Sequence, residues 1–125
     1  MELSIEIHHA EPDIAVLQVS GKLKLGAERD QLEKQVASLL LRNQRRLVVD
    51  LAGVDRIDSA GIGTLAQCAY RASRAGAGLR VAGGNQHVQK LLDMVGLNLV
   101  IDCFPKLEDA LRNFPVRQPG DKARW

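Results

Sequence analysis

The chain has 125 residues, of which 46% are hydrophobic and 3% aromatic, and a net charge of +2; these values correspond to one globular domain with an aliphatic core. Dispersed basic residues and scarce aromatics argue against nucleic-acid binding. No stretch approaches the about 20 apolar residues that span a bilayer. The acidic N-terminus does not resemble a secretory signal. Cys68 and Cys103 lack the spacing of a metal or disulfide motif, so we expect no metal site and two reduced thiols in a cytoplasmic protein.

Alternation of apolar and polar residues predicts that the chain opens with a β-hairpin. Residues 3–7 alternate, residues 11–13 (Glu-Pro-Asp) supply a turn, and residues 14–19 form the second strand, which Gly21 ends. After Gly26 the apolar spacing changes to that of an amphipathic helix.

A continuous apolar run follows at residues 47–51 and predicts a central strand covered on both faces. A loop over residues 52–58 then leads to a second amphipathic helix, which begins near Ser59 and ends near Gly76. Residues 79–82 form the next short strand.

The last third of the chain continues this alternation. Apolar spacing over residues 88–95 predicts a helix that Gly96 stops. Residues 100–101 form a short strand, and residues 107–114 form a final helix.

This order of elements predicts an α/β fold. We expect a mixed, mostly parallel sheet with an N-terminal antiparallel hairpin and flanking helices. The domain covers residues 1–114, and residues 115–125 form a flexible C-terminal tail. The core should contain the apolar positions of the central strand and of two helices, namely Val48, Leu51, Ile62, Leu65, Leu92 and Val95.

Residues 58–63 (Asp-Ser-Ala-Gly-Ile-Gly) stand where the central strand gives way to a helix. Asp and Ser before an apolar run are most often simple N-cap residues. Two glycines in the first helical turn each cost about 1 kcal/mol relative to Ala, however, which indicates a packing or functional reason for them. Gly61 and Gly63 would let another protein approach Ser59 closely, at a helix terminus that favours negative charge.

Two enzymatic interpretations of this segment are weaker. Its glycine spacing loosely fits a dinucleotide fingerprint, but the predicted loop separates it from its strand, and no acidic residue follows the next strand. Nucleophilic catalysis by Ser59 would need a histidine base, and nothing in the sequence aims one of the three histidines at it. We therefore expect neither enzymatic activity nor a cofactor.

Residues 47–51 (Leu-Val-Val-Asp-Leu) followed by residues 57–63 resemble the signature of the STAS domain family, and in particular of its anti-sigma factor antagonists. The resemblance covers residues 3–114 and includes residues 93–97 (Asp-Met-Val-Gly-Leu). It implies that Ser59 is phosphorylated by an anti-sigma factor that is also a serine kinase. By this resemblance, the unphosphorylated protein binds the anti-sigma factor and frees a sigma factor, whereas the phosphorylated protein lets go.

The resemblance also implies a partner-binding surface that consists of Asp58, Ser59, Ala60, Gly61, Gly63 and Lys24. Lys24 departs from the family, which often has an acidic residue at this place, and Ala60 replaces a second serine found in several relatives. An alternative with the same fold is a regulatory subunit of a membrane transporter, bound to an ATPase component. A small-ligand sensor is a third possibility, and the oligomeric state is left open.

Overall fold

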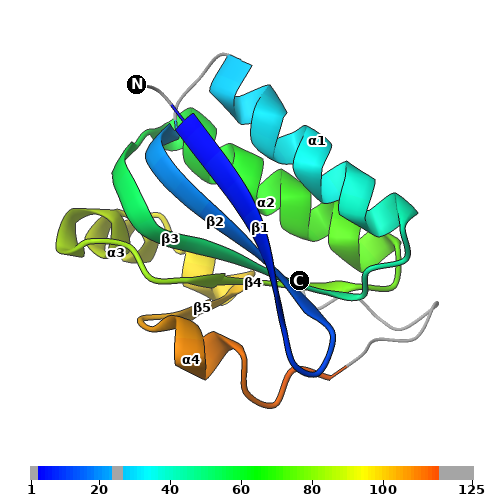
Figure 1. Cartoon of the computed structure of the whole chain (residues 1–125). Coiled ribbons are helices and arrows are strands. Elements are labelled where there is room, and N and C mark those ends of the chain that lie inside the picture. Colours follow the sequence, from blue (N-terminus) through cyan, green and yellow to red (C-terminus); the bar gives the residue numbers. More distant parts are fainter. Residues whose placement is uncertain (1–2, 24–26, 116–125) are drawn as a thin grey trace.

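One five-stranded sheet organises the part of the chain that the computed structural model describes, residues 3–23 and 27–115 (Figure 1). The first two strands form the predicted antiparallel hairpin, and every later neighbouring pair is parallel. The predicted fold class is therefore confirmed. Across the sheet the strands keep the order of the chain: β1 (Leu3–Ala10), β2 (Ile14–Leu23), β3 (Arg46–Ile57), β4 (Gly78–Ala82) and β5 (Asp102–Phe104).

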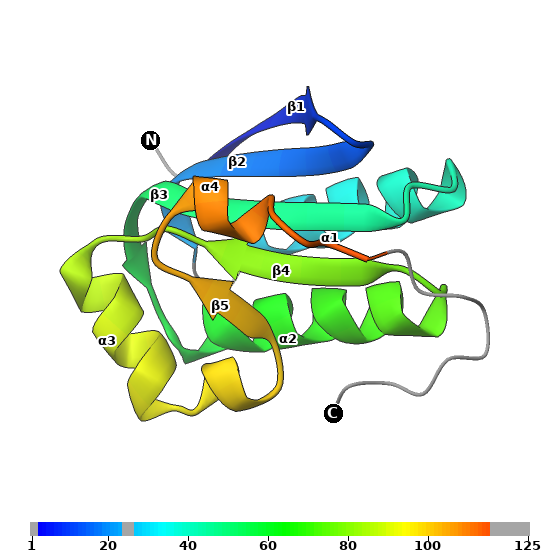
Figure 2. The same cartoon turned by 90° about the horizontal axis from the view of Figure 1, so that it is seen from below.

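Helices lie on both faces of this sheet. One face is covered by α1 (Ala27–Leu41), α2 (Ser59–Arg74) and α3 (Gln86–Met94), and the other by the single turn α4 (Leu107–Ala110). Figure 2 shows α4 and α1 on opposite sides of the sheet. Within the described residues, no helix is both long and apolar enough to cross a membrane.

The central strand β3 supplies side chains to both layers. Leu47 and Val49 belong to the larger core cluster under α1 and α2, whereas Val48 belongs to the smaller cluster under α4. Successive side chains of a strand point to opposite faces, so a continuous apolar run is what this position requires. The prediction of a strand covered on both faces is confirmed.

The predicted core is correct except at Val95. Val48, Leu51, Ile62, Leu65 and Leu92 are buried, but Val95 is 53% exposed. The helix α3 already ends at Met94, and Gly96 takes the left-handed conformation with φ of 75°. The chain then turns into the 3₁₀ helix η1 (Leu97–Leu99), so that Leu97 enters the core cluster after the turn instead of Val95.

The predicted ends of two strands are wrong in the same direction. β2 continues past Gly21 to Leu23, and β3 continues to Ile57, so most of the loop predicted over residues 52–58 is strand. The two extensions pair with each other, with register shifts between Gln18 and Ser20 and between Gly21 and Lys22. Such bulges let a strand accommodate glycine without ending.

The end of the domain also differs from the prediction. Residues 100–101 are not a strand, because η1 and a bend precede β5, which begins at Asp102. The final helix is the single turn α4, and residues 111–114 continue without helical structure. The tail predicted over residues 115–125 lies outside the described residues except for Pro115, so its flexibility stays a prediction.

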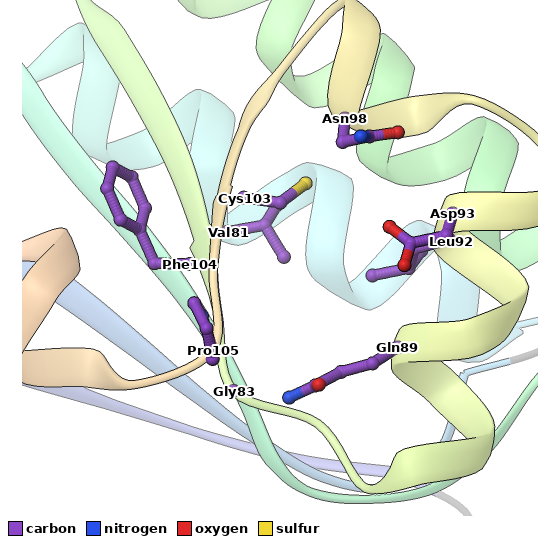
Figure 3. Close-up of a pocket in the computed structure, with 9 residues that line it drawn as sticks. All are labelled: Val81, Gly83, Gln89, Leu92, Asp93, Asn98, Cys103, Phe104 and Pro105. Atoms are coloured by element: carbon purple, nitrogen blue, oxygen red, sulfur yellow. The ribbon is translucent and has the colours of Figure 1, made fainter.

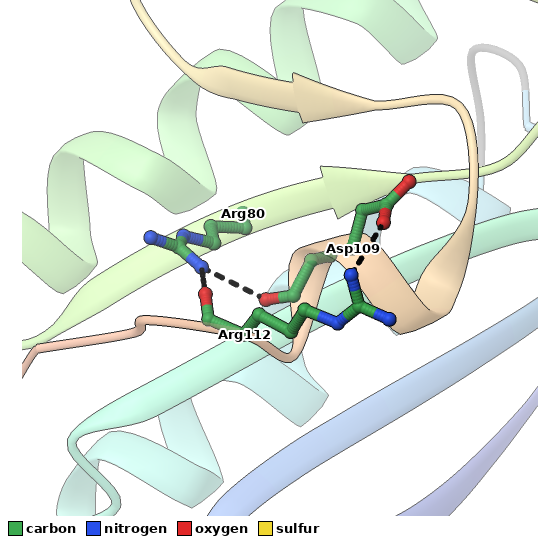
Figure 4. A network of polar contacts seen from close by, with 4 residues as sticks. Arg80, Asp109 and Arg112 are labelled. Carbon is green, nitrogen blue, oxygen red and sulfur yellow. Dashed lines mark hydrogen bonds and ion pairs between the residues drawn. The ribbon is translucent and has the colours of Figure 1, made fainter.

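Arginine side chains hold this last segment, residues 107–114, which we call the C-terminal strap. Arg80 of β4 donates hydrogen bonds to three of its carbonyl oxygens, those of Ala110 (3.0 Å), Arg112 (2.7 Å) and Asn113 (2.8 Å). Figure 4 shows the bond to Arg112 and the ion pair between Arg112 and Asp109. The Arg80 guanidinium also lies 4.3 Å from the centroid of the Phe114 ring. Arg46 of β3 donates to the Phe114 carbonyl oxygen at 2.6 Å. The strap is thereby fixed over the smaller core cluster.

Candidate functional site

The joint between β3 and α2 is built around Asp58. Its backbone is extended, with φ of −112°, and its Oδ1 accepts a hydrogen bond from the Gly61 N–H at 2.8 Å. Its carbonyl oxygen accepts a second bond from the Ile62 N–H at 3.0 Å. The side-chain bond satisfies a donor that a helix terminus would otherwise leave without an intrahelical partner, and the bond from Ile62 is the first of the helix itself. The N-cap interpretation holds for Asp58.

Ser59 is not the cap but the first residue of α2, and it is exposed. Its hydroxyl makes no hydrogen bond to any residue that the structure describes. The next hydroxyl along the helix belongs to Thr64, which is 2% exposed and donates to the Ala60 carbonyl oxygen at 3.0 Å. Over the first two turns of α2, Ser59 is the hydroxyl that a partner could reach.

The two glycines of the segment occupy different environments. Gly61 is buried, and a Cβ at this position would collide with the Leu23 carbonyl oxygen and lie 2.9 Å from Cγ1 of Ile57. The same Leu23 oxygen accepts a hydrogen bond from the Asp58 N–H at 3.3 Å. Gly61 thus lets α2 rest on the end of β2, so the close approach that it permits is made by the protein's own chain.

Gly63, by contrast, lies at the surface. It is exposed, and nothing lies within 4 Å of the position where its Cβ would be. The structure brings Ser59, Gly63 and the half-buried Ala60 together on the first turns of α2, next to the cap Asp58. The sixth residue of the predicted partner surface, Lys24, lies outside the described residues.

Sequence reasoning missed a pair of basic side chains near this joint. Lys22 of β2 and Arg56 of β3 are both exposed and are register partners on neighbouring strands, so they share a face of the sheet. Arg56 lies two residues before Asp58, while Lys22 lies next to Leu23, on which α2 rests. The only signal in the sequence was the strand period continuing beyond Gly21 and Gly53.

The cysteines lie apart from this joint and are not joined to each other. Burial raises the pKa of the Cys68 thiol to about 12, and the nearby Glu33 carboxylate adds to the shift. Burial likewise raises the pKa of Cys103 to about 11, with further contributions from Asp102 and Asp93. Both thiols are therefore neutral at physiological pH, unlike the thiolate of a reactive cysteine. Among the described residues no group of three or more His, Cys, Asp or Glu side chains is arranged to hold a metal ion.

Comparison with known proteins identifies the family. The family model described as "Mlab, STAS domain" matches residues 8–102, which is most of the chain. The chain therefore belongs to the STAS domain family, as its resemblance indicated.

Individual relatives agree with this assignment. The chain is 26% identical to the anti-sigma F factor antagonist of Paenibacillus polymyxa over 117 residues, which cover 93% of this chain and 98% of the relative. Among solved structures, an anti-sigma factor antagonist from Mycobacterium paratuberculosis is similar with a TM-score of 0.78 at 22% identity, covering 88% of this chain and 92% of that one.

Two more distant structures share the fold. One is the Bacillus cell fate determinant SpoIIAA in its phosphorylated form, with a TM-score of 0.65 at 12% identity, covering 86% of this chain and 96% of that one. The other is the murine anion transporter Slc26a9, with a TM-score of 0.66 at 16% identity, covering 88% of this chain but 21% of the transporter. At these identities the likeness is one of fold.

Proposed function

We propose that this protein is a cytoplasmic anti-sigma factor antagonist, a protein-binding switch without enzymatic activity of its own. In its unphosphorylated form it binds an anti-sigma factor and so frees a sigma factor. The anti-sigma factor is also a serine kinase, and phosphorylation of Ser59 releases the complex. The observation that carries the proposal is the exposed Ser59 hydroxyl at the first position of α2 in a STAS domain. The similarity to an anti-sigma F factor antagonist supports it.

The chemistry of the joint is compatible with such a switch. A phosphate on Ser59 adds a charge of about −1.5 to −2 at neutral pH. The Asp58 carboxylate next to it opposes the new charge, whereas the N-terminus of α2 favours it. Because the two effects oppose each other locally, we expect the modified protein to stay folded. The added charge and bulk then act on the partner bound over Ser59, Ala60 and Gly63.

The direct test is phosphorylation in vitro by a kinase-type anti-sigma factor from the same organism, with the phosphate located by mass spectrometry. We expect modification of Ser59 in the wild-type protein and none in Ser59→Ala. That variant removes little volume and no cap, since Asp58 caps the helix, so it should lose at most about 0.5 kcal/mol of stability. Phosphate found only at other residues would contradict the proposal.

The same variants predict the behaviour of the complex. Ser59→Ala should bind the anti-sigma factor and resist release by ATP, whereas Ser59→Asp should bind at least about tenfold more weakly, because it adds a charge to the contact surface. Asn43→Asp is the matched control: it adds one charge at the exposed turn before β3, where the left-handed φ of 68° suits Asp as well as Asn. Equal binding by Ser59→Asp and Asn43→Asp would count against a contact at Ser59.

A second candidate is a regulatory subunit that binds the ATPase component of a membrane transporter. The STAS-like fold within the murine anion transporter favours it. A pull-down with the full chain from lysate distinguishes the two functions, because recovery of an ATPase subunit supports the transporter and recovery of a histidine-kinase-like anti-sigma factor supports the switch.

A further inference from the structure

A cleft of about 200 Å³ opens between α3 and the strands β4 and β5, on residues that the proposed switch does not use. Its apolar wall is formed by Val81, Leu92 and the Cys103 thiol, and its polar wall by Gln89, Asp93 and Asn98 (Figure 3). The figure shows Asp93 and the Cys103 thiol pointing into the space. A cleft of this size is smaller than the pockets that hold drug-sized ligands, so a ligand would be of about one ring.

The polar wall has unused acceptors. Within the described residues, the side chains of Asp93 and Asn98 make no hydrogen bond and no ion pair. The Gln89 amide nitrogen donates to the Gly84 carbonyl oxygen at 3.0 Å, which leaves the amide oxygen of Gln89 without a donor among the same residues. Three acceptor side chains around an apolar wall suit a ligand that carries several N–H donors.

Two carboxylates place negative charge near the cleft. The carboxylates of Asp102 and Asp93 add to the effect of burial in raising the pKa of the Cys103 thiol, so both act on the interior of the cleft. Asp93 also lies in the last turn of α3, which contains no basic residue. The negative end of the helix dipole therefore adds to the carboxylate charge.

We propose that this cleft binds a small organic cation, with its ammonium or guanidinium group against Asp93 and Asn98 and its apolar body against Val81, Leu92 and Cys103. The carboxylate supplies the charge, and the amide oxygens accept the remaining N–H groups. The apolar wall favours cations with a ring-sized hydrocarbon body over small ones such as methylammonium. This inference is independent of the function proposed for Ser59.

Three probes test charge and shape separately by NMR titration of the amide spectrum of the whole chain. Benzylamine carries both the cation and the apolar body, benzyl alcohol has the same size without the charge, and methylamine has the charge without the body. We expect saturable shifts at Asp93, Asn98 and Cys103, with benzylamine binding about three- to fivefold more tightly than either other probe, as for an ion pair that stays open to solvent.

Two variants with the same change of charge complete the experiment. Asp93→Asn should reduce benzylamine to the affinity of benzyl alcohol, whereas Glu108→Gln, at an exposed position of α4 on the other face of the sheet, should leave it unchanged. The amide spectra show directly that both variants are folded. Shifts that do not saturate or lie outside the cleft, equal binding of benzylamine and benzyl alcohol, or an unchanged affinity in Asp93→Asn would each overturn the inference.

Discussion

At the scale of single residues, Gly61 and Gly63 show that the same residue type can meet two different structural requirements within one helix. Both lie in the first turns of α2, where glycine is a poor helix former. At Gly61 the carbonyl oxygen of Leu23 occupies the space that a Cβ would need, while at Gly63 that space is open. The first glycine therefore serves the fold, and the second is free to serve a partner.

This difference predicts opposite effects of the same substitution. Gly61→Ala should destabilise the protein by about 1–3 kcal/mol, because the new methyl group overpacks the contact between α2 and β2. Gly63→Ala should stabilise it by up to about 1 kcal/mol through helix propensity. Urea denaturation of both variants measures the two changes, and changes of the same sign would refute the packing argument.

Gly63→Ala also separates stability from function. If Gly63 lies under the anti-sigma factor as proposed, the added methyl group should weaken the complex even though the domain becomes more stable. Affinity measured on the same preparations decides this, since a more stable variant that binds more weakly cannot be explained by unfolding.

At the scale of elements, the sequence predicted the type of nearly every helix and strand but misplaced several ends. Gly21 was interpreted as the end of a strand and Gly53 as part of a loop, whereas both lie inside strands. At Gly53 a Cβ would lie 3.2 Å from the Val19 carbonyl oxygen, so the glycine permits a close approach of β2 and β3. A single sequence does not reveal which backbone will pass beside a glycine. Local pattern was enough to place Ser59 at the helix start. The structural role of Gly61 and the pairing of Lys22 with Arg56 depend on neighbouring backbone, so the sequence did not predict them.

The misplaced end of α3 leads to a paired prediction. Leu92 is 4% exposed and Val95 is 53% exposed, although both belong to the predicted apolar stripe. Leu92→Ala should cost about 2 kcal/mol or more, because it removes core contacts and leaves a cavity, whereas Val95→Ala should change stability by less than about 0.5 kcal/mol. Thermal or urea unfolding of the two variants is sufficient, and comparable losses would mean that Val95 is covered in the folded protein.

At the scale of the whole molecule, the C-terminal strap is a separate layer with its own fixing point. Arg80→Met keeps most of the side-chain volume but removes the three hydrogen bonds to the strap. We expect a loss of about 1–3 kcal/mol and faster hydrogen exchange at the Ala110 and Leu111 amides, which bond within α4.

Arg112→Met is the matched control for this prediction. The Arg112 side chain makes an exposed ion pair with Asp109 at 3.7 Å, which is worth at most about 0.5 kcal/mol, and its backbone carbonyl still accepts from Arg80. Equal losses in the two variants would show that the strap is not held through Arg80.

The order of the strands across the sheet has a consequence for how the chain is made. Because each strand after β1 pairs with the one synthesised just before it, its partner has already left the ribosome when that strand emerges. Pairing between sequence neighbours also keeps the contact order lower than pairing between strands farther apart in the chain would, and a lower contact order favours faster folding. The exception is the layer under α4. Ile14 and Val48 are covered on that side of the sheet only after Phe114 has been made, a hundred residues after Ile14.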